Sequence, residues 1–283
     1  MPQRIKHIWN RALTHRSEVA CIYLFQLVCG IVIGCITFST IDNTIGQSMA
    51  LHHLTSGFDR TVFMDMINNN EGVLSPISLW AIALVPIYLL ISILLQGGFI
   101  YNIRKGEIGY QSQLRNGLNN ILPFLGYAFL SVLMALVSLI AIGLIFKGVV
   151  GDPLTTFSSE KPFVISLLIA VTFYSIIITL IWGWSIATRM FYIDSSSFGT
   201  SIRSGFIFIK THLISVLLIG FLLLGVHLLL AIIYYLIMED RGAPSWLIVF
   251  IGIVIQQVFS FAKVYIRSWG YIAIDQIEDK FIG

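Results

Sequence analysis

Six stretches of this chain contain no Asp, Glu, Lys or Arg, and each is long enough to cross a lipid bilayer. The shortest has 21 residues, and together they cover 19–41, 72–103, 116–146, 162–188, 211–238 and 242–262. An α-helix rises about 1.5 Å per residue, so about 20 apolar residues span a hydrocarbon core about 30 Å thick. The pattern predicts an all-α, polytopic membrane protein with six transmembrane helices.

The composition excludes a water-soluble protein. Hydrophobic residues make up 57% of the chain and charged residues only 11%, and the mean hydropathy is +0.88. A surface with so few charges would not stay in water. The longest segment between the stretches, 42–71, has 30 residues and is too short for a separate soluble domain. We therefore expect one membrane domain over residues 1–283.

The distribution of positive charge predicts the orientation. Six spans place both termini on one side, and 13 of the 17 Lys and Arg residues fall on that side. Cytoplasmic loops carry the excess of Lys and Arg, so both termini should be cytoplasmic. The first stretch is longer than the apolar core of a signal peptide and no cleavage motif follows it, which favours an uncleaved first span.

Two segments outside the spans have amphipathic patterns. Residues 1–17 place Ile and Trp near helical spacing opposite Lys and Arg, which predicts an interfacial helix on the cytoplasmic side. Residues 42–71 form the one large external loop, for which we expect two short surface helices. The amphipathic external loop could cap a cavity or contact a partner.

A short pattern recurs before alternate spans. Trp9–Leu13, Leu114–Leu118 and Ile202–Phe206 each read large, polar, polar, small, large. Each predicts an interfacial entry helix whose small residue allows close approach to a span. The fold would then consist of three similar units, each an entry helix followed by a transmembrane hairpin.

Three polar residues are expected at mid-membrane depth. His227 lies 10 residues inside the outer end of the fifth span, and Gln256 and Gln257 lie at a similar depth in the sixth. A polar group in hydrocarbon needs a hydrogen-bond partner. The cluster is either a clamp between helices or a proton or substrate site. The clamp is favoured, because no Asp or Glu at that depth would complete a proton relay.

Four cations lie near the inner ends of the even-numbered spans: Arg104, Arg189, Lys263 and Arg267. One interpretation is that they are cations reaching to the inner boundary of the membrane. The alternative is a shared basic ring that binds an anionic lipid headgroup.

No pattern of catalytic or metal-binding residues is present. Neighbouring His52 and His53 cannot both face one metal from a regular helix, and no H-x-x-x-H or H-E-x-x-H motif occurs. Three cysteines lie in the first span and are expected to be apolar packing residues: Cys21, Cys29 and Cys35. We expect no metal, no cofactor and no nucleic-acid partner.

The chain also resembles known membrane-protein families. The entry helix with Trp9, the external motif Gly57–Phe63 and the six spans resemble uncharacterised six-helix inner-membrane proteins of Bacteroidota-type bacteria. The element Arg203–Phe206 is more distantly similar to the membrane domain that accompanies some glycerophosphodiester phosphodiesterases. The resemblance implies a bacterial inner-membrane location and carries no catalytic residues, because the phosphodiesterase barrel is missing here.

These observations leave three classes of function. The first is a non-enzymatic scaffold or accessory subunit that contacts membrane lipids and a membrane-protein partner. The second is a transporter or permease for a lipid-like or small amphipathic substrate, which a polar cavity reaching His227 and Gln256 would favour. The third is an intramembrane enzyme, which would need a nucleophile and base or a metal set at one depth.

Overall fold

The computed structural model describes the backbone of residues 2–45, 71–150, 160–238 and 246–282. These ranges form eight helices and contain no strand: α1 (Pro2–Thr14), α2 (Arg16–Ile45), α5 (Glu71–Lys105), α6 (Tyr110–Asn119), α7 (Ile121–Val150), α9 (Glu160–Ser195), α10 (Phe198–Met238) and α11 (Trp246–Ile282). All except α1 and α6 are long and apolar enough to cross a membrane. The predicted all-α, six-span architecture is confirmed. Residues 46–70 of the predicted external loop lie outside the described ranges.

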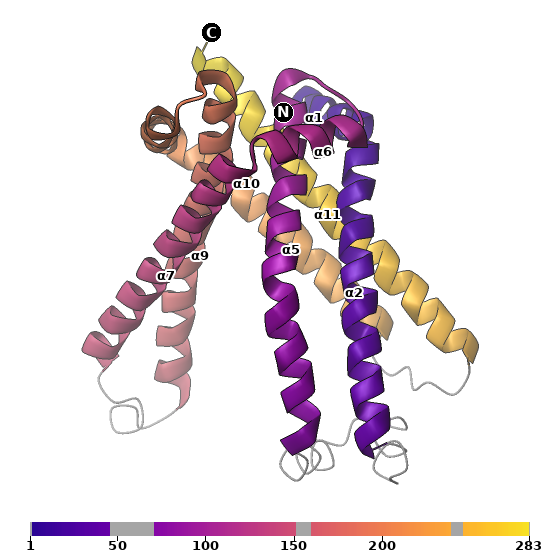
Figure 1. The fold of residues 1–283 in the computed structure, drawn as a ribbon. Coiled ribbons are helices and arrows are strands. Elements are labelled where there is room, and N and C mark those ends of the chain that lie inside the picture. The colour runs from indigo at the N-terminus through magenta and orange to yellow at the C-terminus, as the bar shows by residue number, and fades with distance from the viewer. Residues whose placement is uncertain (1, 46–70, 151–159, 239–245, 283) are drawn as a thin grey trace.

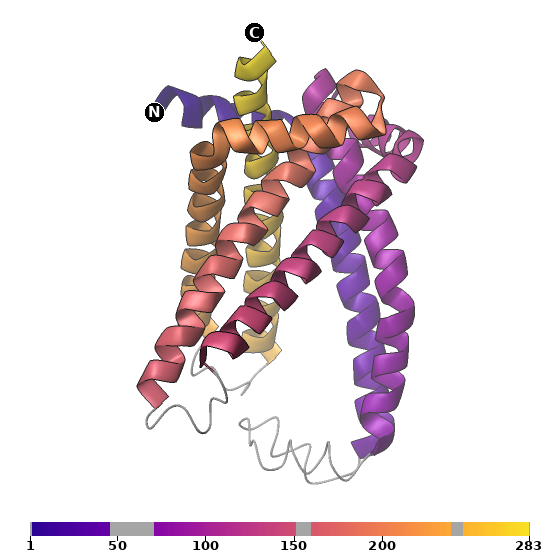
Figure 2. The same ribbon diagram turned by 90° about the vertical axis from the view of Figure 1, so that its left-hand side faces the viewer.

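Three helical segments lie across one end of the molecule (Figure 2). They are α1, α6 and the first part of α10, up to a bend at His212, where φ is −114° and ψ is 25°. Each leads into an antiparallel pair of long helices: α2 with α5, α7 with α9, and the rest of α10 with α11. This is the arrangement of three units that the recurring sequence pattern predicts. We call this end of the molecule the entry layer.

Each entry helix packs on the returning helix of another unit. The entry helix α6 contacts α5, α10 contacts α9, and α1 contacts α11, so the three units close into a ring. The small residue of each recurring motif is buried: Ala12, Gly117 and Gly205. A Cβ atom at Gly117 would overlap the backbone oxygen of Leu94, and one at Gly205 would overlap the Thr188 hydroxyl. The small residues therefore allow the close approach that the sequence predicts.

Glycines also form the turn between α5 and α6. Gly106 has φ of +70° and Gly109 has φ of +118°, both in the left-handed region. Glycine adopts these angles without the steric cost of a side chain. The turn reverses the chain direction and places α6 against the end of α5.

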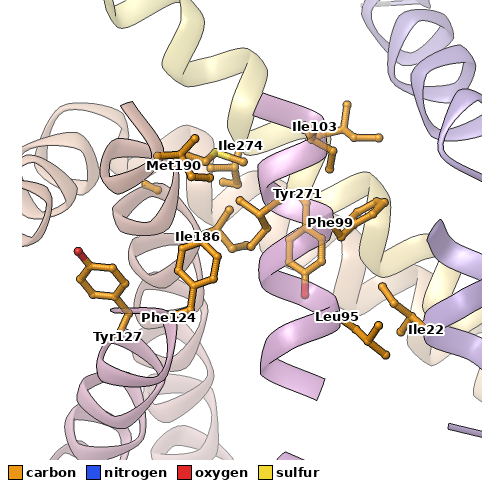
Figure 3. Packing of buried hydrophobic residues seen from close by; sticks show 14 of the residues in the cluster. Ile22, Leu95, Phe99, Ile103, Phe124, Tyr127, Ile186, Met190, Tyr271 and Ile274 are labelled. Carbon is orange, nitrogen blue, oxygen red and sulfur yellow. The ribbon is translucent and has the colours of Figure 1, made fainter. Parts of the chain in front are cut away.

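The hydrophobic core lies just beneath the entry layer. Figure 3 shows Phe99 and Tyr271 side by side at its centre, with Ile186 next to them. The ring centroids of Phe99 and Tyr271 are 5.8 Å apart. Buried residues of α2, α5, α7, α9, α10 and α11 all belong to this one cluster. The core therefore joins all six spans at one end.

The long helices diverge away from the entry layer. The pair α2–α5 and the pair α7–α9 lean apart toward the opposite end (Figures 1 and 2). The most apolar 18-residue windows of α7 and α9 contain no buried residue. Apart from the sides on which α7 and α9 contact each other and α9 contacts α10, these helices expose apolar side chains.

Both ends of the chain belong to the entry layer. The helix α1 and the last turns of α11 lie at the same end of the molecule (Figure 1). The helix α11 continues to Ile282, well past the last residue of the charge-free stretch 242–262. The turns of α11 after residue 262 place Tyr271, Ile272 and Ile274 in the hydrophobic core, which stabilises this part of the helix.

Candidate functional site

A buried carboxylate, Glu18, organises one side of the entry layer. Its side chain is fully buried at the start of α2. Glu18 Oε1 accepts a hydrogen bond from the backbone N–H of Gly109 at 2.9 Å and lies 3.0 Å from Nδ1 of His15. Its Oε2 accepts from the Ser17 hydroxyl at 2.8 Å. A buried charge needs such partners, so Glu18 fastens α2 to the turn between α5 and α6.

Amides extend this polar cluster onto α6. Asn102 Nδ2 donates to the Ser112 hydroxyl at 2.8 Å, and Asn116 Nδ2 donates to Asn102 Oδ1 at 3.1 Å. One residue of α6 reaches back to α5, where Gln113 Nε2 donates to the Leu95 carbonyl at 2.9 Å. Asn102, Gln113 and Asn116 are all buried. These bonds fix the position of the entry helix on the span.

An ion-pair network joins four helices on the other side of the layer. Arg104 of α5 pairs with Asp194 of α9 at 2.6 Å, and with Asp275 and Glu278 of α11 at 3.2 Å and 3.3 Å. Arg11 of α1 pairs with the same Asp275 at 2.6 Å. The side chains of Asp275 and Glu278 are 1% and 0% exposed. Two guanidinium groups are required there to compensate the buried carboxylates.

The helix α9 carries polar atoms that lack such compensation. Arg189 is 7% exposed, and its Nε has no hydrogen-bond partner among the described residues. The same is true of Trp184 Nε1 and Thr188 Oγ1. The close approach of Gly205 covers both of these atoms. This face of α9 is held by packing rather than by hydrogen bonds.

The predicted mid-membrane cluster forms no shared hydrogen bond within the described part of the chain. His227 Nδ1 lies 2.7 Å from the carbonyl oxygen of Leu223 in its own helix, to which it donates. Gln257 Oε1 accepts from the Tyr23 hydroxyl of α2 at 2.9 Å. The side chain of Gln256 is exposed. Gln257 does connect two spans, but its partner helix is α2 instead of α10.

The four cations of the predicted basic ring have different surroundings. Arg104 is engaged by three carboxylates, and Arg189 is buried in the layer. Lys263 and Arg267 are exposed on α11, and both line a groove on the side of the molecule. Lys263 Nζ lies 4.5 Å from the ring centroid of Phe259, one turn nearer the start of α11. The aromatic face attracts this ammonium group.

The groove lies between α2, α5 and α11 and has a volume of about 580 Å³. Aromatic contacts join the same three helices, and Tyr88 also lines the groove. The Phe25 and Tyr88 rings stack at 5.6 Å between α2 and α5, and the Tyr23 and Phe261 rings meet at 5.4 Å between α2 and α11. A concave, mostly apolar site of this size with a few polar groups is typical of binding sites for small or amphipathic molecules.

The sequence analysis missed the acidic half of the entry layer. Glu18, Asp194, Asp275 and Glu278 are the partners that hold its Arg and His residues. A signal was present, because acidic residues also occur at the ends of the charge-free stretches, beside the Lys and Arg residues that set the orientation. No periodicity in the sequence indicates which of these charged residues form ion pairs with each other.

The residues described include no group of three or more His, Cys, Asp or Glu placed to hold a metal ion. His52 and His53 lie outside the described ranges. The arrangement as a whole can do two things chemically: the polar layer fixes helices relative to one another, and the groove can accept an amphipathic molecule.

Comparison with protein-family models, with curated proteins and with solved structures finds no match to this chain. The resemblance to Bacteroidota-type membrane proteins and to phosphodiesterase membrane domains therefore stays a prediction.

Proposed function

We propose that this chain is a non-enzymatic protein of the bacterial inner membrane that acts as a scaffold or accessory subunit for another membrane protein. The observation that carries this proposal is the exposed apolar surface of α7 and α9. Their most apolar windows bury no residue against the rest of the chain. Transmembrane helices associate by van der Waals packing of their side chains, and a partner's helices would cover this surface.

The entry layer supports the same proposal. Its ion pairs and buried amides join α1, α2, α5, α6, α9 and α11 at one end. A layer fastened in this way holds the α2–α5 pair and the α7–α9 pair at an angle to each other and leaves apolar surface on their far halves for partner helices. The excess of Lys and Arg on the side of the termini supports a cytoplasmic position for the layer.

Site-specific photo-crosslinking in cells tests the proposal. A photoreactive residue replaces Leu136 or Ile140 on α7, which are 51% and 61% exposed. The control positions are Leu228 and Ile232 on α10, which are 56% and 58% exposed at the same spacing. We expect the α7 positions to give one reproducible protein adduct that the α10 positions do not give. Adducts with lipid alone from both helices would overturn the proposal.

A second function, transport of a lipid-like substrate, is favoured by one observation, the groove between α2, α5 and α11. Reconstitution into liposomes separates the two functions. A transporter moves a fluorescent phospholipid between leaflets, where dithionite quenches it, faster than protein-free liposomes do. A scaffold leaves this rate unchanged.

A further inference from the structure

The groove between α2, α5 and α11 combines apolar walls with two cations. About two turns of α2 form one wall, including Gln26 and Gly30, and Leu84 and Tyr88 of α5 contribute to another. The cations Lys263 and Arg267 stand one turn apart on α11. Most of the remaining wall is aliphatic: Val28, Val32, Ile33, Val85, Ile87 and Val264. One end of the groove is therefore cationic and the rest is suited to hydrocarbon.

The cationic end lies at the level of the entry layer. Trp9 of α1 packs against Trp269 and Tyr265 of α11, with ring centroids 5.3 Å and 6.0 Å apart, and Arg267 lies between those two residues in sequence. An amphipathic helix with Trp lies at the depth of lipid headgroups. Ile33 lies 15 residues after Glu18, which places it about 22 Å along the span from the polar layer. The groove thus runs from the headgroup region toward the middle of the bilayer.

The two cations have no anionic partner in the part of the chain whose side chains are described. The carboxylates of the entry layer pair with other groups: Glu18 with His15, Asp194 with Arg104 and Lys105, and Asp275 and Glu278 with Arg104. Lys263 Nζ instead lies over the Phe259 ring. Positive side chains within spans are costly unless paired and mark sites where a charged ligand binds.

We propose that this groove binds an anionic phospholipid of the leaflet in which the entry layer lies. The phosphate lies between Lys263 and Arg267, and one acyl chain extends along the wall formed by α2. Basic pockets between transmembrane helices bind anionic headgroups in this way. The site does not depend on the scaffold function, because either a scaffold or a transporter can hold such a lipid.

Charge removal tests the headgroup end of the site. Native mass spectrometry of the purified full chain in mild detergent measures binding of phosphatidylglycerol, phosphatidylcholine and inorganic phosphate. The attraction of one Lys or Arg near a membrane corresponds to about fivefold in affinity, so Lys263→Gln with Arg267→Gln should weaken phosphatidylglycerol binding about 25-fold. The matched control, Arg203→Gln with Lys210→Gln, removes two exposed cations of α10 outside the groove and should leave binding unchanged.

Filling the groove tests the acyl-chain end without changing any charge. Gly30 lines the groove and Gly34 lies one turn further along α2 outside it, and a Cβ atom at either position would meet nothing within 4 Å. Gly30→Phe should displace the acyl chain and weaken phosphatidylglycerol binding about tenfold or more, as expected for losing several buried methylene groups. Gly34→Phe should bind as the wild type does. Thermal melting of both variants checks that they fold alike.

The outcomes distinguish a phospholipid site from a site for a free anion and from unselective binding of lipid. Preference for phosphatidylglycerol over phosphatidylcholine that is lost in Lys263→Gln with Arg267→Gln and in Gly30→Phe, but kept in both controls, supports the proposal. Equal binding of the two lipids by the wild type would overturn it. Binding of inorganic phosphate as tight as that of the lipid, or equal effects of Gly30→Phe and Gly34→Phe, would also overturn it, because the acyl chain would then contribute nothing.

Discussion

Gly98→Ala is the most direct perturbation of the contact between an entry helix and its span. Gly98 is buried in α5, facing α6. A Cβ atom there would overlap the backbone oxygen of Gln113 and would lie 3.1 Å from the backbone nitrogen of Gly117. Because both neighbours are backbone atoms, no side chain can rotate to make room. The whole of α6 would have to move away from α5.

The size of the effect follows from three contributions to the free energy of unfolding. Overpacking a tight contact costs about 1–3 kcal/mol, and displacing α6 loses the bond from Gln113 to Leu95, worth about 1 kcal/mol. Alanine is better than glycine in a helix by about 0.5–1 kcal/mol. The net destabilisation of Gly98→Ala is therefore about 1–3 kcal/mol. The control Gly34→Ala has open space and should gain about 0.5–1 kcal/mol.

Unfolding of the two variants in mixed detergent micelles, followed by the loss of native near-ultraviolet circular dichroism as SDS is added, measures this difference. The expected gap between Gly98→Ala and Gly34→Ala is about 2–4 kcal/mol in free energy of unfolding. If Gly98→Ala were as stable as Gly34→Ala, α6 would not pack on α5 as described, and the reasoning from close approach would be refuted.

Two further changes test the polar contacts by the same unfolding measurement. Arg104→Gln removes a cation that pairs with buried Glu278 and leaves buried Asp275 paired with Arg11, and it should cost about 3–5 kcal/mol. Lys105→Gln, at an exposed ion pair, should cost about 0–1 kcal/mol; equal losses would contradict the network. Tyr23→Phe removes one hydrogen bond between α2 and α11 and should cost about 0.6–1.7 kcal/mol. Combined with Gln257→Ala, it should show non-additive losses, and full additivity would mean that the two side chains do not interact.

The spans were predictable from the sequence because lipid imposes a strict condition on them. A residue that meets hydrocarbon cannot carry an unpaired charge, so the six charge-free stretches located all six membrane helices. The absence of charge shows where a helix meets lipid but not where the helix ends. The charge-free stretch 242–262 therefore does not indicate that α11 continues to Ile282. Asp275 and Glu278 can lie in this buried part of the helix because Arg104 pairs with both of them.

The close packing of the entry helices was predictable from the sequence, but the ion pairs of the entry layer were not. The small residue in each recurring motif indicated close packing, and Gly117 and Gly205 provide it. The partners of the charges could not be predicted, because they join residues far apart in the sequence. Arg11 and Asp275, separated by 264 positions, meet only when the third unit closes on the first. His227 illustrates the same limit: its depth was inferred from counting, but its bond to Leu223 depends on the side-chain rotamer.

The central claim is that this chain crosses the membrane six times, and we propose that its entry layer lies on the cytoplasmic side. Single cysteines in a variant that lacks the three native cysteines test it by labelling with an impermeant maleimide in intact cells. Arg115→Cys on α6 and Arg203→Cys on α10 should react only after the membrane is opened, whereas Arg60→Cys and Asp152→Cys, in predicted external connections, should react at once. Labelling of Arg115→Cys or Arg203→Cys in intact cells, or of the two entry-layer positions from opposite sides, would contradict the account.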